Sequence, residues 1–417
     1  MADGMNKPAI RFAGFTDAWE QRKAKELFVS TADKGYPELP VLSATQDRGM
    51  IRRDENSINI FHDKKNEAGY KRVLPGQFVI HLRSFQGGFA HSAIEGITSP
   101  AYTVFGFSEP EKHDSEYWKY VFTSKSFIQR LKTVTYGIRD GRSISYEEFL
   151  TLGFVYPSKA EQTAIARYLD KLSDLITLHQ REYAKLVNIK ASMLEKMFPK
   201  DGSAYPEVRF AGFTDAWEQR KFSEVFSFLQ NNTLSRADLS EESGAAKNVH
   251  YGDVLIKFGE YLDVKKVHLA FIPTEAVANK YKASFLQNGD IIIADTAEDE
   301  TVGKCCEIAN SEGNTLVSGL HTMPCRPNQK YASGFLGYYM NSPAYHDQLL
   351  PLMQGTKVTS VSKTAISDTQ LIYPVSVDEQ RRISQYLLSI DNLITLHQRK
   401  LEKLQNIKKS MLEKMFV

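Results

Sequence analysis

The sequence contains little cysteine and no long apolar run. Its 417 residues include three cysteines, Cys305, Cys306 and Cys325, which are too few for a disulfide framework and match no zinc-binding spacing. No apolar stretch approaches the roughly 20 residues that span a bilayer, and the N-terminal residues lack the apolar core of a signal peptide. These absences predict a cytoplasmic protein without a membrane segment.

The chain also lacks a strong charge of either sign. Its 52 basic and 50 acidic residues give a net charge of +2, which neither requires nor excludes nucleic acid. A protein that binds duplex DNA can gather its basic groups on one face. The length predicts two or three domains, each large enough to bury its own core.

Motifs for catalysis are incomplete. Ser99–Tyr102 and Ser342–Tyr345 lack the second proline of the [DNS]-P-P-[YFW] motif of amino-methyltransferases. Gly303-Lys304-Cys305 lacks the first glycine and the hydroxyl of a phosphate-binding loop. The acidic run Asp295–Lys304 lacks the E-x-K spacing of metal-dependent nucleases and is interpreted as a solvated loop. We therefore predict no catalytic residue and no cofactor in this chain, although residues brought together only in space stay open.

Two segments of the chain occur twice. The thirteen residues RFAGFTDAWEQRK stand at Arg11–Lys23 and again, letter for letter, at Arg209–Lys221. The segment Glu161–Phe198 is similar to Glu379–Phe416, 218 positions later. The long segments between these repeats show no convincing similarity. Repeated ends around dissimilar middles indicate a common frame that holds two variable modules.

The second repeat has the periodicity of a coiled coil. Apolar residues alternate at spacings of four and three, without a proline or glycine, so each helix could extend about 55 Å. We expect the two helices to pair in antiparallel fashion; the alternative is that each is an amphipathic helix packed on its own module. The predicted seam consists of Ile165, Leu169, Leu172, Ile176, His179 and Leu186 in the first helix, and of Ile383, Leu387, Ile390, Ile394, His397, Leu401 and Leu404 in the second.

Both helices carry the same polar residues in this seam. His179 matches His397, and Lys190 matches Lys408. A histidine there could bind a metal, or it could fix the helix register through a hydrogen bond. No second histidine or cysteine lies one turn away to complete a site, so register is the favoured interpretation and no metal is predicted.

The variable modules have mixed α/β patterns in the same order. Strands are predicted within Val73–Leu82 and Thr98–Phe107, and a helix over Ser115–Val134. The second module has a predicted strand within Phe285–Asp295 and a predicted helix over Ser333–Leu350. A loop rich in glycine, hydroxyl and basic residues follows in each module, at Thr135–Ser145 and Met353–Lys363. We call these the late loops. Each leads to a Tyr-Pro pair, Tyr156-Pro157 or Tyr373-Pro374.

We call the repeated thirteen residues the tag. Twice along the chain, a tag is followed by a variable module, by the sequence YPSKAEQ or YPVSVDEQ, and by a long helix. This order resembles the DNA-specificity subunit of type I restriction-modification systems over essentially the whole chain. The resemblance implies an α+β fold: two mixed α/β target-recognition domains separated by two long helices that pair as an antiparallel coiled coil with pseudo-twofold symmetry. The expected boundaries are 1–157 for the first tag and recognition domain, 158–200 for the central helix, 201–373 for the second tag and domain, and 374–417 for the last helix.

The same resemblance implies a function without catalysis. Each recognition domain would read one half of a split site in double-stranded DNA, and the helices would set the number of unread base pairs between the halves. The family subunit positions two modification subunits, which methylate adenine N6 with S-adenosylmethionine. It also recruits restriction subunits that use ATP and Mg²⁺.

DNA contacts are predicted from residue type and position. Basic and hydroxyl residues bind phosphates, and Arg, Lys, Asn, Gln, Ser and Thr read base edges in the major groove. For any single residue, a solvated surface group is the alternative. The candidates are Arg52, Arg53, Arg83, Ser84, Gln86, Arg139, Arg142 and Ser143 in the first module, and Lys257, Lys357, Thr359, Ser360 and Lys363 in the second.

Two other functions stay open at this point. The chain could be a coiled-coil scaffold whose modules bind proteins or small ligands, or a self-contained nuclease. Salt separates DNA reading from the scaffold, because binding to phosphates weakens steeply as salt rises.

Overall fold

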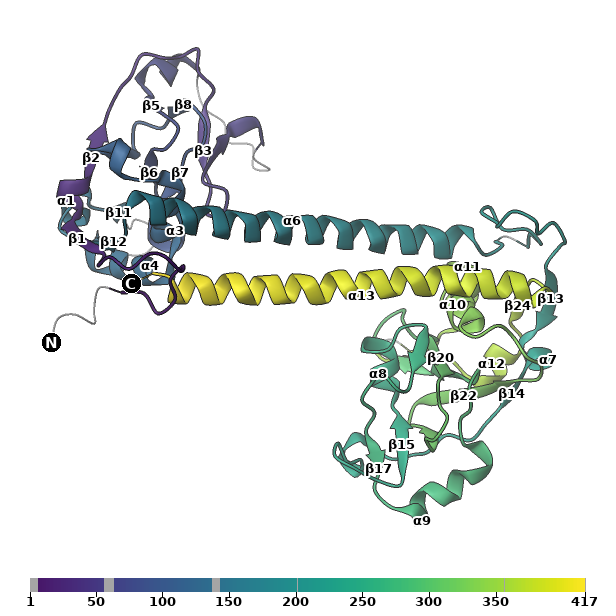
Figure 1. Cartoon of the computed structure of the whole chain (residues 1–417). Helices are drawn as coiled ribbons and strands as arrows, with labels where there is room; N and C mark the ends of the chain where they lie inside the picture. The colour runs from purple at the N-terminus through teal and green to yellow at the C-terminus, as the bar shows by residue number, and fades with distance from the viewer. Residues whose placement is uncertain (1–6, 56–63, 137–142, 201, 356, 417) are drawn as a thin grey trace. The chain divides into compact units, whose positions relative to one another are not determined.

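The computed structural model describes residues 7–55, 64–136, 143–200, 202–355 and 357–416, which form two compact units. The first unit runs to His179 and takes in the chain from Lys400 onward, and the second contains Gln180–Arg399. Each unit holds one variable module and part of both long helices, α6 (Lys159–Lys196) and α13 (Val377–Lys414), which are labelled in Figure 1. Within the described ranges, every helix is too short or too polar to cross a bilayer.

Each repeated tag ends in a strand that pairs with the last strand of its module. β1 (Glu20–Lys23) runs antiparallel to β12 (Gly153–Tyr156). β13 (Glu218–Lys221) runs antiparallel to β24 (Gln370–Tyr373) in the same register. The EQRK strand of each tag and the strand that ends at the Tyr-Pro pair therefore form a two-stranded ribbon, which we call the closing ribbon of the module. This pairing explains why both recur although the residues between them differ.

A four-stranded antiparallel sheet in the order β2-β9-β6-β7 forms the centre of the first module. Two ribbons, β3-β4 and β5-β8, accompany it. The strands predicted within 73–82 and 98–107 are confirmed as β6 and β9. The bounds are β2 (Phe28–Thr31), β3 (Leu42–Ala44), β4 (Met50–Arg52), β5 (Lys71–Val73), β6 (Phe78–Ile80), β7 (Ala90–His91), β8 (Gly96–Thr98) and β9 (Thr103–Phe107).

The second module contains a five-stranded sheet in the order β14-β22-β18-β20-β16 and a three-stranded sheet in the order β17-β15-β21. β16 is parallel to β20 and β15 to β21, whereas the other pairs are antiparallel. The strand predicted within 285–295 is confirmed as β18. The bounds are β14 (Phe226–Phe228), β15 (Ala246–Val249), β16 (Tyr261–Asp263), β17 (Phe271–Ile272), β18 (Ile291–Ala294), β20 (Cys305–Ala309), β21 (Leu316–Ser318) and β22 (Thr322–Pro327).

The two main sheets have the same pairing order despite their different letters. The order β2-β9-β6-β7 corresponds to β14-β22-β18-β20, and all these pairs are antiparallel. Beside these sheets, the second module contains β16 and the three-stranded sheet, and the first module contains the ribbons β3-β4 and β5-β8. A mixed α/β character and long helices are thus confirmed.

The main helix of each module is interrupted at a serine. A single helix is predicted in each module, but each contains two: α3 (Ser115–Thr123) and α4 (Lys125–Leu131), or α10 (Phe335–Met340) and α11 (Pro343–His346). Both intervening serines have extended backbone, and the Ser124 hydroxyl accepts from an amide of the α4 first turn. The single-helix prediction is wrong at these serines, and in the second module also at its end, because α11 stops at His346 and not at Leu350. Serine caps a new helix well.

The remaining short elements connect these parts. The short α-helices are α1 (Ala24–Leu27), α2 (Ser84–Gly87), α5 (Tyr146–Phe149), α7 (Phe222–Val225), α8 (Tyr251–Ile256), α9 (Glu275–Ala278) and α12 (Lys363–Ser367). The 3-10 helices are η1 (Arg53–Glu55), η2 (Lys64–Gly69), η3 (Pro110–Lys112), η4 (Lys132–Val134), η6 (Arg236–Asp238), η7 (Asn279–Ser284) and η8 (Leu350–Leu352).

The predicted seam residues differ in their surroundings along each helix. Ile165 and Leu169 lie in the core of the first module, and Ile383 and Leu387 lie in the core of the second. The first turns of both helices therefore pack on their own module, as the alternative interpretation expects. Leu172 and Ile390 are also buried, whereas the later seam positions Ile176, His179, Leu186, Ile394, His397, Leu401 and Leu404 are half-buried.

A bidentate ion pair joins each tag to the start of the following helix. Arg11 Nε and Nη2 donate to the two carboxylate oxygens of Glu161, at 2.7 Å each. Arg209 makes the same pair with Glu379, at 2.6 and 2.9 Å. Both glutamates are almost fully buried, at 1 and 2% side-chain exposure. This arginine–glutamate clamp explains the glutamate of both EQ motifs.

The glutamine of each EQ motif connects the module to the start of the long helix. Gln162 donates to the Pro157 carbonyl and accepts from the Asp114 amide. Gln380 donates to the Pro374 carbonyl and accepts from the Ala332 amide. The Tyr-Pro pair, the helix start and the module therefore meet at one side chain.

The residue just before each tag also contacts the end of a long helix. In the first unit the Ile10 amide donates to the Lys414 carbonyl at the end of α13. In the second unit the Val208 amide donates to the Lys196 carbonyl at the end of α6. The aromatic residue that follows each helix packs in a module core or against it, with Phe416 on Tyr117 and Phe198 on Phe335.

The clamp generates a stability prediction. Arg209→Met should lower the free energy of unfolding of the second unit by about 3–5 kcal/mol, because Glu379 would stay buried without its counter-charge. Arg220→Met is the matched control: its pair with Glu218 is exposed and should contribute less than about 1 kcal/mol. Hydrogen exchange of the β24 amides at increasing urea measures both. Equal losses in the two variants would contradict the account.

The second module should also lose stability as pH rises. Burial raises the pKa of Glu307 from 4.5 to about 7, although the Gly334 and Gly337 amides donate to its carboxylate. The folded chain then holds the Glu307 proton more tightly than the unfolded chain does. Protonated Glu307 therefore adds to the free energy of unfolding below about pH 4.5, and this stabilisation is lost as the pH rises through about 7. Its size is on the order of 1.4 kcal/mol per unit of pKa difference. Glu307→Gln should flatten the dependence of the unfolding temperature on pH, and an unchanged slope would refute this assignment.

Candidate nucleic-acid interface

The late loop of the second module is held by an isolated backbone bridge and by a neighbouring strand pair. Gln354 and Ser360 exchange backbone hydrogen bonds, and β23 (Thr359–Ser360) pairs with β19 (Thr296–Ala297). Gly355 makes the turn at a φ of 114°, where an added Cβ would lie 2.0 Å from the Val358 carbonyl oxygen. The loop is therefore a tight hairpin.

This hairpin presents most of the residues predicted to touch DNA in the second module. Lys357 and Ser360 are exposed, and Thr359 is half-buried, with its hydroxyl 3.4 Å from the Asp299 carbonyl oxygen. Lys363 is the first residue of α12, and its Nζ lies 5.4 Å from the centre of the Phe228 ring. Ammonium and hydroxyl donors on one hairpin suit contact with phosphates or base edges.

The late loop of the first module has the same position in the fold. β10 (Thr135–Tyr136) pairs with β11 (Ser143–Ile144), so a hairpin again precedes a short helix, α5, whose first turn is capped by Ser145. In the second module Ser362 caps α12 in the same way. Arg139 and Arg142 lie outside the described residues, and of Ser143 only the backbone is described, in β11. Their predicted contacts stay predictions.

The acidic run is a neighbour of the late loop that sequence reasoning missed. Asp295–Lys304, interpreted from the sequence as a solvated loop, contains β19, and the Val361 amide donates to the Asp295 carbonyl. Glu298, Asp299 and Glu300 are exposed beside the hairpin. Carboxylates there repel phosphate and can accept from base amino groups. The signal was weak because the two segments are about sixty residues apart in the sequence.

The turn after β6 places its predicted residues in different environments. Arg83 and Gln86 are exposed, and Gln86 accepts a hydrogen bond from Gln46 of the β3–β4 turn. Ser84 is fully buried, and its hydroxyl accepts from the His81 amide. Ser84 therefore supports the turn, and its burial argues against the predicted contact with DNA. Gln46 was not among the predicted residues.

The other candidates lie apart from the late loops in the sequence. Arg52, at the end of β4, is exposed, with Nε 3.7 Å from an Asp54 oxygen. Arg53 is half-buried, and its Nε and Nη1 have no hydrogen-bond partner among the described residues. Lys257, which follows α8, is exposed and pairs with Asp253 at 2.9 Å. Both nitrogens are closed off from solvent, so Arg53 does not present them to a phosphate in this conformation.

A family model matches the second half of the chain. Residues 214–406, from within the second tag to the last quarter of α13, match the type I restriction modification DNA specificity domain. The matched segment contains the second module and its closing ribbon.

Curated relatives carry the same description. The chain is 23% identical to the type I restriction enzyme MjaVIII specificity subunit of Methanocaldococcus jannaschii over 61% of this chain and 59% of that protein. It is 24% identical to the putative type I restriction enzyme MjaX specificity subunit of the same organism over 51% of this chain and 48% of that one. The matches thus span about half the length of these relatives. The resemblance drawn from the sequence is confirmed.

The fold is shared with a solved structure over its full length. The S subunit of a type I restriction-modification system from M. genitalium covers 99% of both chains, with a TM-score of 0.52 and 13% sequence identity. At this identity the similarity concerns the fold alone.

The hairpin geometry predicts unequal costs for two alanine substitutions. Gly355→Ala should expose the Ser360 and Val361 amides to hydrogen exchange, because its Cβ would overlap the Val358 carbonyl in addition to the left-handed strain of about 1–2 kcal/mol. Gly313→Ala bears the strain alone, because its φ is 78° and no described atom lies within 4 Å. Equal protection of the hairpin amides in both variants would contradict the tight turn.

Proposed function

We propose that this chain, whose residues 214–406 belong to the type I restriction modification DNA specificity domain family, is the non-catalytic DNA-specificity subunit of a type I restriction-modification complex. One observation carries the proposal. Two modules with dissimilar letters have the same sheet order and are closed by ribbons that begin with identical tags. A protein that reads two different half-sites needs two modules that differ from each other, held in a frame that is the same in both halves.

Each module would read one half of a split site in double-stranded DNA. The late loops support this role, because in each the two arms pair through their backbones just before a short serine-capped helix, and the two loops differ in sequence. In the second module, Lys357 and Lys363 would contact phosphates, while Thr359 and Ser360 would contact phosphates or bases. The exposed carboxylates of the acidic run would reject other placements of the backbone.

The two long helices would pair as an antiparallel coiled coil that sets the number of unread base pairs. Contacts within each unit support the pairing. Lys408 of α13 donates to Ser173 of α6 in the first unit, and Lys190 of α6 pairs with Asp391 of α13 in the second. In both pairs a late residue of one helix meets an early residue of the other, as antiparallel helices require.

The helices would also dock two modification subunits. Leu175 and Leu178 of α6 are 44 and 52% exposed, and their repeat equivalents Leu393 and Leu396 of α13 are 44 and 45% exposed. Two exposed leucines one turn apart offer apolar surface on which a protein partner could pack. Because the same pair occurs in both units, each would receive a copy of the same partner. The partners would supply adenine-N6 methylation with S-adenosylmethionine, and restriction subunits would supply ATP- and Mg²⁺-dependent cleavage.

Mapping of adenine methylation tests the function. In cells that co-express this chain with a cognate modification subunit, long-read sequencing should find methylation confined to a two-part motif with one gap length. The modification subunit expressed alone is the control and should give no such motif. A one-part motif, or no methylation although the two proteins co-purify, would contradict the proposal.

Salt dependence then separates DNA reading from the scaffold alternative, which the exposed leucines also suit. The assembled complex should bind a duplex more weakly as salt rises. The logarithm of the association constant should fall against the logarithm of the salt concentration with a slope of about −0.9 per phosphate neutralised. Binding that is insensitive to salt would favour the scaffold.

A further inference from the structure

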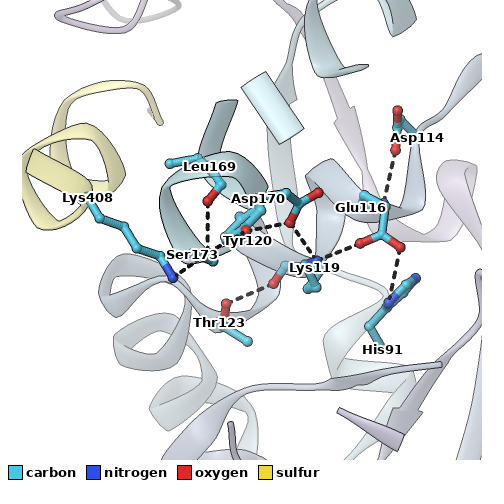
Figure 2. Close-up of polar contacts among 10 residues, drawn as sticks. All are labelled: His91, Asp114, Glu116, Lys119, Tyr120, Thr123, Leu169, Asp170, Ser173 and Lys408. Atoms are coloured by element: carbon cyan, nitrogen blue, oxygen red, sulfur yellow. Dashed lines mark hydrogen bonds and ion pairs between the residues drawn. The ribbon is translucent and has the colours of Figure 1, made fainter. Parts of the chain in front are cut away.

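A chain of polar contacts connects the first module to both long helices (Figure 2). The Tyr120 hydroxyl, on α3, donates to Asp170 of α6 at 2.7 Å, and Lys119 Nζ donates to the same Asp170 oxygen at 3.0 Å. Lys408 Nζ, on α13, donates to the Ser173 hydroxyl of α6 at 2.8 Å and lies 5.9 Å from the centre of the Tyr120 ring. One tyrosine of the module thus meets side chains of α6 and α13.

The second unit contains a corresponding set of contacts. The Tyr338 hydroxyl, on α10, donates to Asp391 of α13 at 2.6 Å. Lys190 Nζ, on α6, pairs with Asp391 at 2.7 Å and with Glu260, just before β16, at 2.7 Å. It also lies 5.7 Å from the centre of the Tyr338 ring. In each unit the lysine therefore comes from the helix that belongs to the other half of the chain.

These two sets, which we call the joints, occupy equivalent positions. Tyr120 and Tyr338 are 218 residues apart, as are Ser173 and Asp391, and Lys190 and Lys408. That offset is the one that relates the two long helices. The modules themselves show no convincing sequence similarity, so a tyrosine kept at this position, with its hydroxyl on a carboxylate and a lysine near its ring, indicates a requirement of the frame.

The joints differ in charge. In the second, burial opposes the ammonium of Lys190, but Glu260 and Asp391 outweigh burial and raise its pKa. In the first, burial and the nearby Lys119 lower the pKa of Lys408, whose hydrogen-bond acceptor is the neutral Ser173 hydroxyl. Asp170 is instead held by Lys119 and Tyr120. The same geometry is thus kept by different chemistry, which argues that position rather than charge is what both modules need.

The first joint borders a cavity, which increases its importance for orientation. A cavity of about 490 Å³ is lined by the β3–β4 turn as well as by Lys119, Asp170 and Lys408. Apolar packing does not reach across this cavity, although Ile165 and Leu169 pack in the module core nearer the start of α6. Directional hydrogen bonds can fix the angle of the module here, because their energy falls steeply with misalignment.

We propose that Tyr120 with Lys408, and Tyr338 with Lys190, are positioning residues that hold each recognition module at one angle on the helix pair and so set the gap between the two read halves. The proposal rests on the proposed function. Neither tyrosine needs to touch DNA. Loss of a joint would let a module rotate or slide, and a shift of about 3.4 Å along the duplex corresponds to about one base pair.

Methylation mapping of joint variants tests the proposal in the complete complex with the modification subunit. Tyr120→Phe and Tyr338→Phe keep the rings and remove only the hydroxyl groups, and Lys190→Met and Lys408→Met remove the ammonium groups. We expect the ratio of methylation at the wild-type gap to methylation at gaps one base pair longer or shorter to fall about tenfold, with both half-site sequences unchanged. Lys408→Arg, which keeps a hydrogen-bond donor at this position, should restore the ratio at least in part.

Lys185→Met and Lys403→Met are matched controls, because both lysines are exposed, lie on the same two helices and are also 218 residues apart. They should leave the gap ratio unchanged. If the joint variants assemble and methylate with the wild-type gap ratio, or if methylation falls equally at every gap in proportion to the loss of thermal stability, the proposal is wrong. The absence of a two-part motif with the wild-type chain would instead contradict the proposed function itself.

Discussion

The buried pairing of a tag arginine with the first glutamate of a long helix is the contact on which the rest of this structure depends. It joins the tag that opens a module to the helix that follows the module, across 150 residues of sequence in the first half and 170 in the second. Each glutamate is almost completely buried, so its charge is tolerable only while the arginine is in place. The neighbouring glutamine then ties the Tyr-Pro carbonyl and a module amide to the same helix start. The sequence of the module in between can vary as long as the tag and the start of the helix are kept.

This division of labour accounts for the pattern of repetition. Identical residues occur where the chain closes a module or begins a helix, and dissimilar residues occur where a module would face its own half-site. The joints extend the frame into the modules themselves, since Tyr120 and Tyr338 recur within otherwise dissimilar sequence. The lysine of each joint comes from the helix of the other half of the chain. Each module is therefore oriented by a lysine that lies more than 100 positions along the sequence from the helix residue that the module's tyrosine contacts.

Much of the fold could be predicted because its signals are periodic or repeated. The long helices, the order of elements and the family resemblance all follow from such patterns. Other features depend on contacts between distant residues and left no local signal. The pairing of the acidic run with the late loop is one, and the burial of Ser84 behind His81 is another. The break at Ser124 was visible in principle, because a serine followed by a new amphipathic turn is a helix start, but the periodicity on either side hid it.

The role of the seam was predicted only in part, for a physical reason. Spacing of three and four marks an apolar face but does not say what covers it. Ile165 and Ile383 turn that face toward their own modules, and the lysines further along meet polar partners on the other helix. Likewise, the bases that would be read cannot follow from composition, because readout depends on where a few side chains lie in a groove.

An exchange of modules would test the separation of frame and reader most directly. The segment between β13 and β24 would be replaced by the corresponding segment of a relative with a different motif, with Tyr338, the closing ribbon and both helices kept. Adenine methylation would then be mapped in cells that also express the modification subunit. The account predicts that one half of the motif changes while the other half and the gap stay the same. A change in both halves, or a new gap with the joint intact, would contradict it.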